Sequence, residues 1–135
     1  MNRPIPPASA MSQPFWDAAA EGRLVVQSCE ACGHLQHYPR AYCLKCLSEA
    51  LGWHQCSGRG AIYSYTVVRK AMHPGFAALV PYVYALVELE EGVRMTTNIV
   101  HVSPEEVRCG QRVSVDWSIQ LDDGRCLPTF APTVR

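Results

Sequence analysis

The amino-acid sequence predicts a mainly β protein, in which an N-terminal helix and a metal-binding ribbon precede a small barrel. Two Cys-x-x-Cys pairs lie in a segment with few apolar residues, and alternating apolar and polar residues begin soon after it. The alternating segments come in the order three strands, one short helix, two more strands. This order is typical of a five-stranded OB-fold barrel with a short helix between its third and fourth strands.

Length, composition and charge limit the function classes. The chain has 135 residues, of which 18% are charged, against about 25% in most globular proteins. Twelve basic residues balance twelve acidic ones, so the formal net charge is +0 and a nucleic-acid partner is unfavoured. The longest apolar stretch, 76–89, contains Pro81 and is too short to span a membrane. With no signal peptide, we expect a cytoplasmic protein without a membrane partner.

The N-terminal part predicts a flexible leader followed by one helix. Residues 1–11 contain three prolines and no apolar core, which is typical of an unstructured leader. The helix is expected over 12–23, with Ser12 as its N-cap, a proline in its first turn and a glycine just past its end. Phe15 and Trp16 lie on one side of it, and we favour core packing over ligand or partner contact for this aromatic pair.

The next segment, 24–57, is predicted to be a zinc ribbon. Four thiols come in two pairs with the spacing that lets them share one ion: Cys29, Cys32, Cys43 and Cys46. The ten residues between the pairs suffice for a strand out and back. Four thiolates close the coordination shell, so the zinc is expected to be structural and not catalytic. An iron site, a redox pair, or a histidine ligand from His34, His37 or His54 are minor alternatives.

No catalytic machinery is evident in the sequence. The best candidate for a nucleophile with a nearby general base is Cys56 with His54. A cysteine and a histidine this close are expected by chance in a chain with seven cysteines and five histidines. The sequence contains none of the common hydrolase, zinc-protease, phosphate-loop or dinucleotide motifs. Cys56, Cys109 and Cys126 are therefore expected to be small buried hydrophobes.

The segment 58–135 is predicted to form the barrel, with Gly58-Arg59-Gly60 as the hinge before it. Alternation and turn residues give five strands and one helical turn. The strands are expected at 62–68, 82–89, 93–100, 112–119 and 126–130, with the helical turn at 103–110.

Several side chains are candidate contacts for acyl-CoA or a protein partner. They combine the aromatic pair of the helix with basic groups and two tyrosines: Phe15, Trp16, Arg40, Lys45, Arg59, Tyr63, Tyr65, Arg69 and Lys70. Scattered cations suit a small phosphorylated ligand better than a polymer, since a polymer needs several phosphate contacts in a row. Tyr63 and Tyr65 are two residues apart, so they are expected to share one strand face. Solvated charges and core packing are the competing interpretations.

The order and spacing of motifs resemble one known family over residues 12–132. The motifs are Phe15-Trp16-Asp17, Glu21-Gly22-Arg23-Leu24, Cys29-x2-Cys32-Gly33, Pro39-Arg40, Cys43-x2-Cys46, Trp53, Gly58-x-Gly60, Ser64-x-Thr66-Val67, Pro81-Tyr82, Val87-Glu88-Leu89 and Gly92. They look like those of the zinc-ribbon and OB-fold proteins first described as domain of unknown function thirty-five.

This resemblance implies a helix, a rubredoxin-like zinc ribbon and an OB barrel, with one structural zinc on the four cysteines. Family members form complexes with thiolase-superfamily enzymes, including aldolases, or with MaoC-like hydratases of acyl-CoA metabolism, and catalysis stays on the partner. We therefore expect a non-catalytic accessory subunit, in a hetero-oligomer of lipid metabolism, whose helix and ribbon dock the partner while the barrel borders the CoA channel. A single-stranded nucleic-acid module is the alternative from another class, because ribbons and OB barrels also bind such strands.

Overall fold

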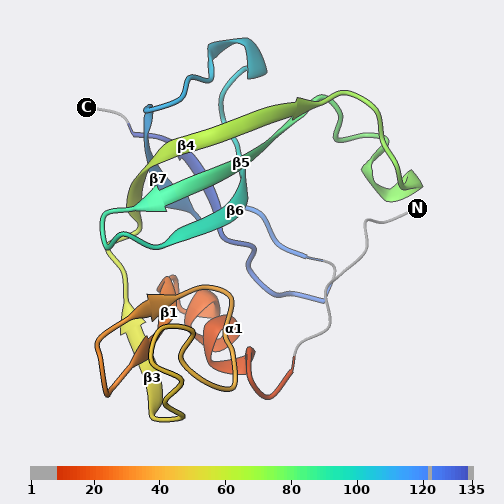
Figure 1. Ribbon diagram of the computed structural model, residues 1–135. Helices are drawn as coiled ribbons and strands as arrows, with labels where there is room; N and C mark the ends of the chain where they lie inside the picture. The colour runs from red at the N-terminus through yellow and green to blue at the C-terminus, as the bar shows by residue number, and fades with distance from the viewer. Residues whose placement is uncertain (1–8, 122, 134–135) are drawn as a thin grey trace.

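The computed structural model describes residues 9–121 and 123–133 and contains a three-stranded sheet, a closed five-stranded barrel and one α-helix (Figure 1). The mainly β architecture predicted from the sequence is confirmed. Most of the predicted leader, residues 1–8, lies outside the described residues. None of the helices in the described ranges is long and apolar enough to cross a membrane.

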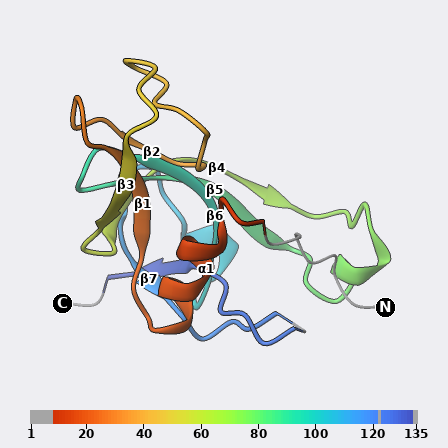
Figure 2. The same ribbon diagram turned by 90° about the horizontal axis from the view of Figure 1, so that it is seen from below.

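The helix α1 (Gln13–Ala20) buries one face against the ribbon and the barrel. Phe15, Ala18 and Ala19 are its buried residues. Ser12 holds the predicted N-cap position, but it makes no side-chain capping bond and its backbone is already helical. Its hydroxyl exchanges hydrogen bonds with Ser9 instead. Figure 2 shows α1 and the three-stranded sheet together on one side of the barrel.

The ribbon sheet has the order β2-β1-β3 and is antiparallel throughout. Its strands are β1 (Val25–Cys29), β2 (Leu35–Gln36) and β3 (Leu51–Gln55). The sequence predicts two strands in the gap between the cysteine pairs. Of the three ribbon strands only β2 lies there, so the prediction is right for one strand and wrong for the other. The long partner of β1 is β3, which follows the second pair.

The barrel closes in the order β4-β5-β6-β8-β7, and β7 pairs back with β4. Its strands are β4 (Arg59–Val68), β5 (Tyr82–Leu89), β6 (Arg94–Ile99), β7 (Arg112–Asp116) and β8 (Thr129–Pro132). All neighbours are antiparallel except β6 and β8. One 3₁₀ turn, Pro104–Glu106, lies between the third and fourth strands as the sequence predicted.

Several strand boundaries differ from the prediction, although the pattern of alternation is clear. The first barrel strand begins at Arg59, three residues earlier than expected, and the third is one residue shorter at each end. The strand expected over 112–119 stops at Asp116, because its carboxylate accepts bonds from the backbone and hydroxyl of Ser118 and turns the chain. The last strand begins at Thr129, three residues later than expected.

The proposed hinge is also shorter than expected. Gly60 belongs to β4, and a Cβ there would lie 2.5 Å from the backbone oxygen of Glu88. Gly58 has a φ of +84°, so the flexible backbone lies just before β4. The predicted boundaries between helix and ribbon, after residue 23, and between ribbon and barrel, after residue 57, stay a proposal.

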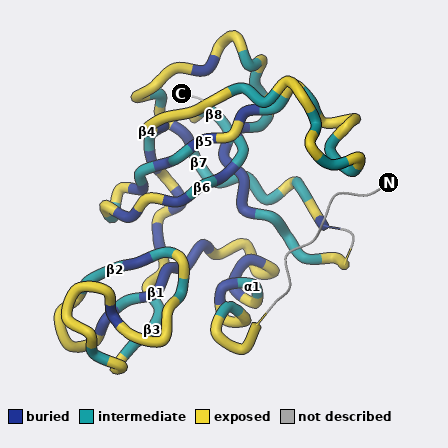
Figure 3. The backbone as a smooth tube through the Cα atoms, turned by 45° about the vertical axis from the view of Figure 1, so that its right-hand side comes forward, coloured by how far each residue is buried: buried dark blue, intermediate teal, exposed yellow. Residues whose placement is uncertain are grey.

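The ribbon and the barrel share one hydrophobic core. The buried cluster joins Phe15, Leu24 and Val26 to barrel residues such as Val93 and Met95. The segments of α1 and β1 that face the barrel are buried in Figure 3. The zinc ribbon is therefore packed onto the barrel and does not hang from it as a separate unit.

Candidate metal centre and ribbon–barrel cavity

The four predicted cysteines meet at one point of the ribbon. Their Sγ atoms all lie within 4.8 Å of one another, with 3.6 Å between Cys29 and Cys46 and 3.7 Å between Cys32 and Cys43. Zinc–sulfur bonds of about 2.3 Å in a tetrahedron place sulfurs about 3.8 Å apart, so the thiols fit this ion. Among the described residues no histidine joins the cluster. The ribbon carries one structural zinc, and these thiols are the groups that would hold it.

Two similar turns present the thiols. The residue after each pair has a left-handed backbone: Gly33 has φ +79° and Leu47 has φ +66°. Each donates its N–H to the carbonyl of the first cysteine of its pair, at 2.8 and 2.9 Å. In the second turn, the N–H groups of Lys45 and Cys46 also point at the Cys43 sulfur, at 3.3 and 3.5 Å. Such donors favour thiolates, which are the form that binds zinc.

The electrostatics favour the thiolate at the first cysteine of each pair. The backbone N–H of Cys32 lowers the pKa of the Cys29 thiol to about 6, against an opposing effect of burial. Burial also opposes ionisation of Cys43, but the N–H groups of Cys46 and Lys45 leave its pKa below the ordinary value. At Cys46 the backbone N–H of Ser48 lowers the pKa, but the neighbouring cysteine thiols raise it to about 12, so these thiols share their protons.

A buried amide pair holds the loop between the two cysteine pairs. Gln36 donates to Gln27 Oε1 at 2.6 Å, and the same oxygen accepts from the N–H of Arg40 at 2.8 Å. Gln27 Nε2 returns a bond to the Arg40 carbonyl at 2.9 Å. Gln36 Oε1 accepts from the N–H of Leu44 at 3.0 Å. Both glutamines are 5% exposed, so this network replaces strand pairing for the loop.

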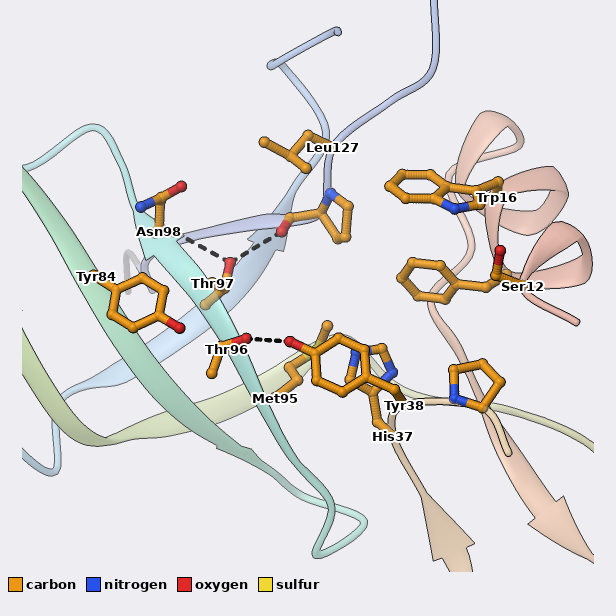
Figure 4. Close-up of a pocket in the computed structure, with 13 residues that line it drawn as sticks. Ser12, Trp16, His37, Tyr38, Tyr84, Met95, Thr96, Thr97, Asn98 and Leu127 are labelled. Atoms are coloured by element: carbon orange, nitrogen blue, oxygen red, sulfur yellow. Dashed lines mark hydrogen bonds between the residues drawn. The ribbon is translucent and has the colours of Figure 1, made fainter. Parts of the chain in front are cut away.

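Where this loop meets the barrel, the structure has a cavity of about 440 Å³ (Figure 4). It is lined from three sides, by α1, by the loop and by β5, β6 and the segment before β8. The residues labelled around it are Ser12, Trp16, His37, Tyr38, Tyr84, Met95, Thr96, Thr97, Asn98 and Leu127. The second and third barrel strands are the surface that OB folds use for ligands, so this is the expected place for a site.

Hydrogen bonds fix the barrel side of this cavity. The hydroxyls of Tyr38 and Thr96 are hydrogen-bonded to each other, which ties the loop to β6. Thr97 donates to the carbonyl of Pro128 at 2.9 Å. Asn98 Nδ2 donates to the Val83 carbonyl at 3.0 Å, which leaves its amide oxygen as the acceptor it can offer.

The cavity is uncharged. No Asp, Glu, Lys or Arg is among the residues that line it in the described part of the chain. Burial lowers the pKa of His37 to about 4, so this ring is neutral at pH 7. The guanidinium of Arg125 stacks on the Trp16 ring at 4.5 Å and pairs with Asp123 at 2.6 Å.

The basic candidate contacts do not gather here. Arg40, Lys45, Arg69 and Lys70 are exposed, and neither they nor Arg59 line the cavity. Arg59 pairs with Glu90 at 3.3 Å. These cations therefore form no phosphate site at the cavity, and their contact with a ligand or partner stays a prediction.

The two candidate tyrosines do not share a face, so that expectation is wrong. A β-bulge between Ile62 and Ser64 shifts the register of β4 against β5 by one residue. Tyr63 therefore lies under the outward guanidinium of Arg94, at 3.8 Å, whereas Tyr65 pairs with buried Ala85 and donates to the Val107 carbonyl at 3.0 Å.

Of the candidate contacts, Phe15 and Trp16 reach the cavity. Phe15 is only 7% exposed and contributes an edge of the core, while Trp16 is half-buried. Sequence reasoning missed Tyr84 and Asn98. Their outward positions on two well-predicted strands were a usable signal, but nothing in the sequence shows that the ribbon loop lies over that face.

The remaining cysteines show no catalytic pairing. Cys56 is buried, and burial together with the Glu91 carboxylate raises its pKa to about 12, opposite to what a nucleophile needs. Cys126 is half-buried, and the expectation of burial is wrong for Cys109, which is exposed on the turn before β7.

Comparisons with known proteins agree with this architecture. Residues 16–52 match the model "ChsH2, rubredoxin-like zinc ribbon domain", and residues 53–118 match "ChsH2, C-terminal OB-fold domain". A solved structure, "Ltp2-ChsH2(DUF35) aldolase", is 38% identical with a TM-score of 0.86, covering 96% of this chain and 100% of that chain.

Two curated relatives have different names. A "Probable enoyl-CoA hydratase alpha subunit" of Thermomonospora curvata is 41% identical over 129 residues, which are 95% of this chain but only 40% of the relative. A "DUF35 domain-containing scaffold protein" of Methanocaldococcus jannaschii is 36% identical over 102 residues, covering 75% of this chain and 72% of the relative. With both domain models in order along the chain, this protein belongs to the DUF35 family of zinc-ribbon and OB-fold proteins.

Proposed function

We propose that this chain is a non-catalytic, zinc-binding accessory subunit of a thiolase-superfamily acyl-CoA enzyme, a thiolase or an aldolase. The observation that carries the proposal is the combination of a closed four-thiol cluster with an uncharged aromatic cavity on the ligand face of the barrel. The thiol cluster has no open metal position, and the described residues that line the cavity include no carboxylate, no cysteine and no charged group. The name of the aldolase relative supports a partner of this class.

The ribbon offers a surface for such a partner. Three apolar side chains around the second cysteine pair are exposed: Tyr42 at 47%, Leu44 at 56% and Leu47 at 69%. Clustered exposed apolar residues mark interaction sites more often than single ones. Arg40 and Lys45 are exposed in the same segment of the chain and suit acidic groups on the partner.

A MaoC-like hydratase is the second candidate partner, because the Thermomonospora curvata relative carries the name of a hydratase subunit. A nucleic-acid partner has less support. The face on which OB folds bind strands lies opposite α1 and the ribbon loop, and none of the described residues that line it there is a cation. The nearby guanidinium of Arg125 stacks on Trp16 and pairs with Asp123.

Co-purification from the native host tests this proposal. The tagged chain, eluted at moderate salt, is expected to bring down a thiolase-like enzyme in fixed stoichiometry with one zinc per chain. Leu44→Asp should weaken the complex at least tenfold, whereas Met72→Asp, a change at an 87% exposed side chain on another loop, should not. A hydratase in the eluate would favour the second candidate. Nucleic acid without an enzyme, or unchanged partner activity after deletion of this chain, would overturn the proposal.

A further inference from the structure

The cavity between the ribbon and the barrel is chemically selective. Its walls are mostly rings and aliphatic groups, with Trp16 of α1 on one side and Tyr84 of β5 on the other (Figure 4), and Phe15 and Met95 also line it. A volume of about 440 Å³ is within the range of small-molecule sites. The dimensions and the apolar walls suit a chain or ring system of modest size.

The polar groups at the cavity are few and neutral. Most are engaged with the protein: Tyr38 with Thr96, and Thr97 with the Pro128 carbonyl. The amide oxygen of Asn98, the hydroxyl of Tyr84 and the neutral imidazole of His37 also line the cavity and can orient a ligand. An oriented neutral carbonyl or amide fits such a site, whereas a phosphate would be desolvated without a cation to pair with it.

A second hollow continues this lining. It has a volume of about 190 Å³, and Asn98 lines both hollows. Its other walls include Phe76, Leu79 and Ile119, and again no charged residue of the described chain lines it. Apolar lining therefore continues beyond the first cavity at Asn98.

We propose that this cavity binds the uncharged acyl part of an acyl thioester and excludes its phosphorylated nucleotide part. The inference rests on the proposed function for the identity of the ligand as a thioester, and on the cavity alone for its apolar, neutral character. The barrel of this subunit is then an acyl-chain site, and the cationic contacts to the nucleotide come from elsewhere.

Calorimetric titration of the zinc-loaded full chain tests this directly. The probes are the neutral N-acetylcysteamine thioesters of acetyl, hexanoyl and decanoyl groups, together with free CoA. We expect affinity to rise about tenfold for every two methylenes until the cavity is filled. Free CoA is expected not to bind at millimolar concentration. Equal affinity for CoA and the decanoyl thioester, or no binding of that thioester, would overturn the proposal.

Two variants locate the site. Tyr84→Ala removes a 49% exposed wall residue, and Leu127→Glu places a charge in the cavity; each should weaken decanoyl binding at least tenfold. The control Tyr63→Ala removes a tyrosine of similar exposure, 51%, that does not line the cavity and should bind normally. If all three variants bound the decanoyl thioester equally well, the acyl chain would bind outside this cavity. If the chain binds the thioester but captures no acyl-CoA enzyme, the acyl site stands and the accessory role is rejected. If it captures such an enzyme but binds no thioester, only the acyl site is rejected.

Discussion

Leu47 has an unfavourable backbone conformation in the second zinc-binding turn. It occupies the left-handed position that Gly33 holds in the first turn, with φ +66° and 69% exposure. A side chain in this conformation costs about 1 kcal/mol that glycine avoids. Leu47 is thus retained at a cost to folding, which fits a role in partner contact.

Replacing this leucine with glycine should therefore stabilise the isolated chain. We expect Leu47→Gly to raise the free energy of unfolding by about 0.5–1 kcal/mol. Leu44→Gly, at an exposed position without positive φ, should lower it by a similar amount. Urea unfolding of both variants with zinc bound gives the comparison. Destabilisation by both changes would show that the side chain of Leu47 packs in the folded state.

His37 makes folding sensitive to acid. Its pKa falls from 6.5 to about 4 on folding because the ring is buried. Below pH 6.5 the unfolded chain therefore takes up a proton that the folded chain refuses, and stability falls until the pH reaches about 4. The full loss is about 3 kcal/mol.

Replacing His37 with an aromatic residue that does not titrate should remove its contribution to the loss of stability at acid pH. His37→Phe keeps an aromatic ring beside Phe15 and Tyr38. Urea unfolding at pH 7, 6 and 5 should show the stability of the wild type falling faster than that of the variant. Protonation of the zinc thiolates affects both proteins alike and cancels in the difference. Parallel curves would mean that His37 is solvated enough to titrate normally.

At the scale of elements, the amide pair of Gln27 and Gln36 takes the place of a missing strand. Gln27→Leu removes both side-chain partners of the Arg40 backbone and the bond that Gln27 accepts from Gln36, although Gln36 keeps its bonds with the Tyr42 carbonyl and the Leu44 N–H. The expected loss is about 2–4 kcal/mol, with faster zinc release to a chelator. Gln55→Leu, an exposed change on β3 of the same sheet, should have little effect. A similar loss for both variants would show that the network adds nothing specific.

The elements differ in how far the sequence predicts them. The boundaries of β5 were predicted to the residue, because its side chains alternate between core and solvent and a glycine turn follows. The bulge in β4 was not predicted, since one extra residue leaves no mark in a tyrosine- and serine-rich strand. The thiol cluster follows from spacing alone. The cavity does not, because it is built by α1, the ribbon loop and β6, whose approach depends on packing between distant segments.

At the scale of the whole molecule, zinc should stabilise more than the ribbon. The ribbon buries Leu24, Val25 and Val26 in the same cluster as Val93 and Met95 of the barrel. Since a structural zinc contributes folding energy directly, its loss releases ribbon residues that also cover the barrel core. The stability of the barrel is therefore linked to the metal, although no barrel residue is in the thiol cluster.

Removal of one ligand tests this linkage. Cys43→Ser should release zinc and lower the melting temperature by more than 10 °C, on the order of 3 kcal/mol or more for a chain of this size. Hydrogen exchange should then speed up in β6 as well as in β1, because the two strands share a core. Cys109→Ser changes an exposed thiol outside the cluster and should leave both unchanged. If hydrogen exchange in β6 kept its wild-type rate after zinc loss, the barrel would be an independent folding unit, and the ribbon could unfold without destabilising it.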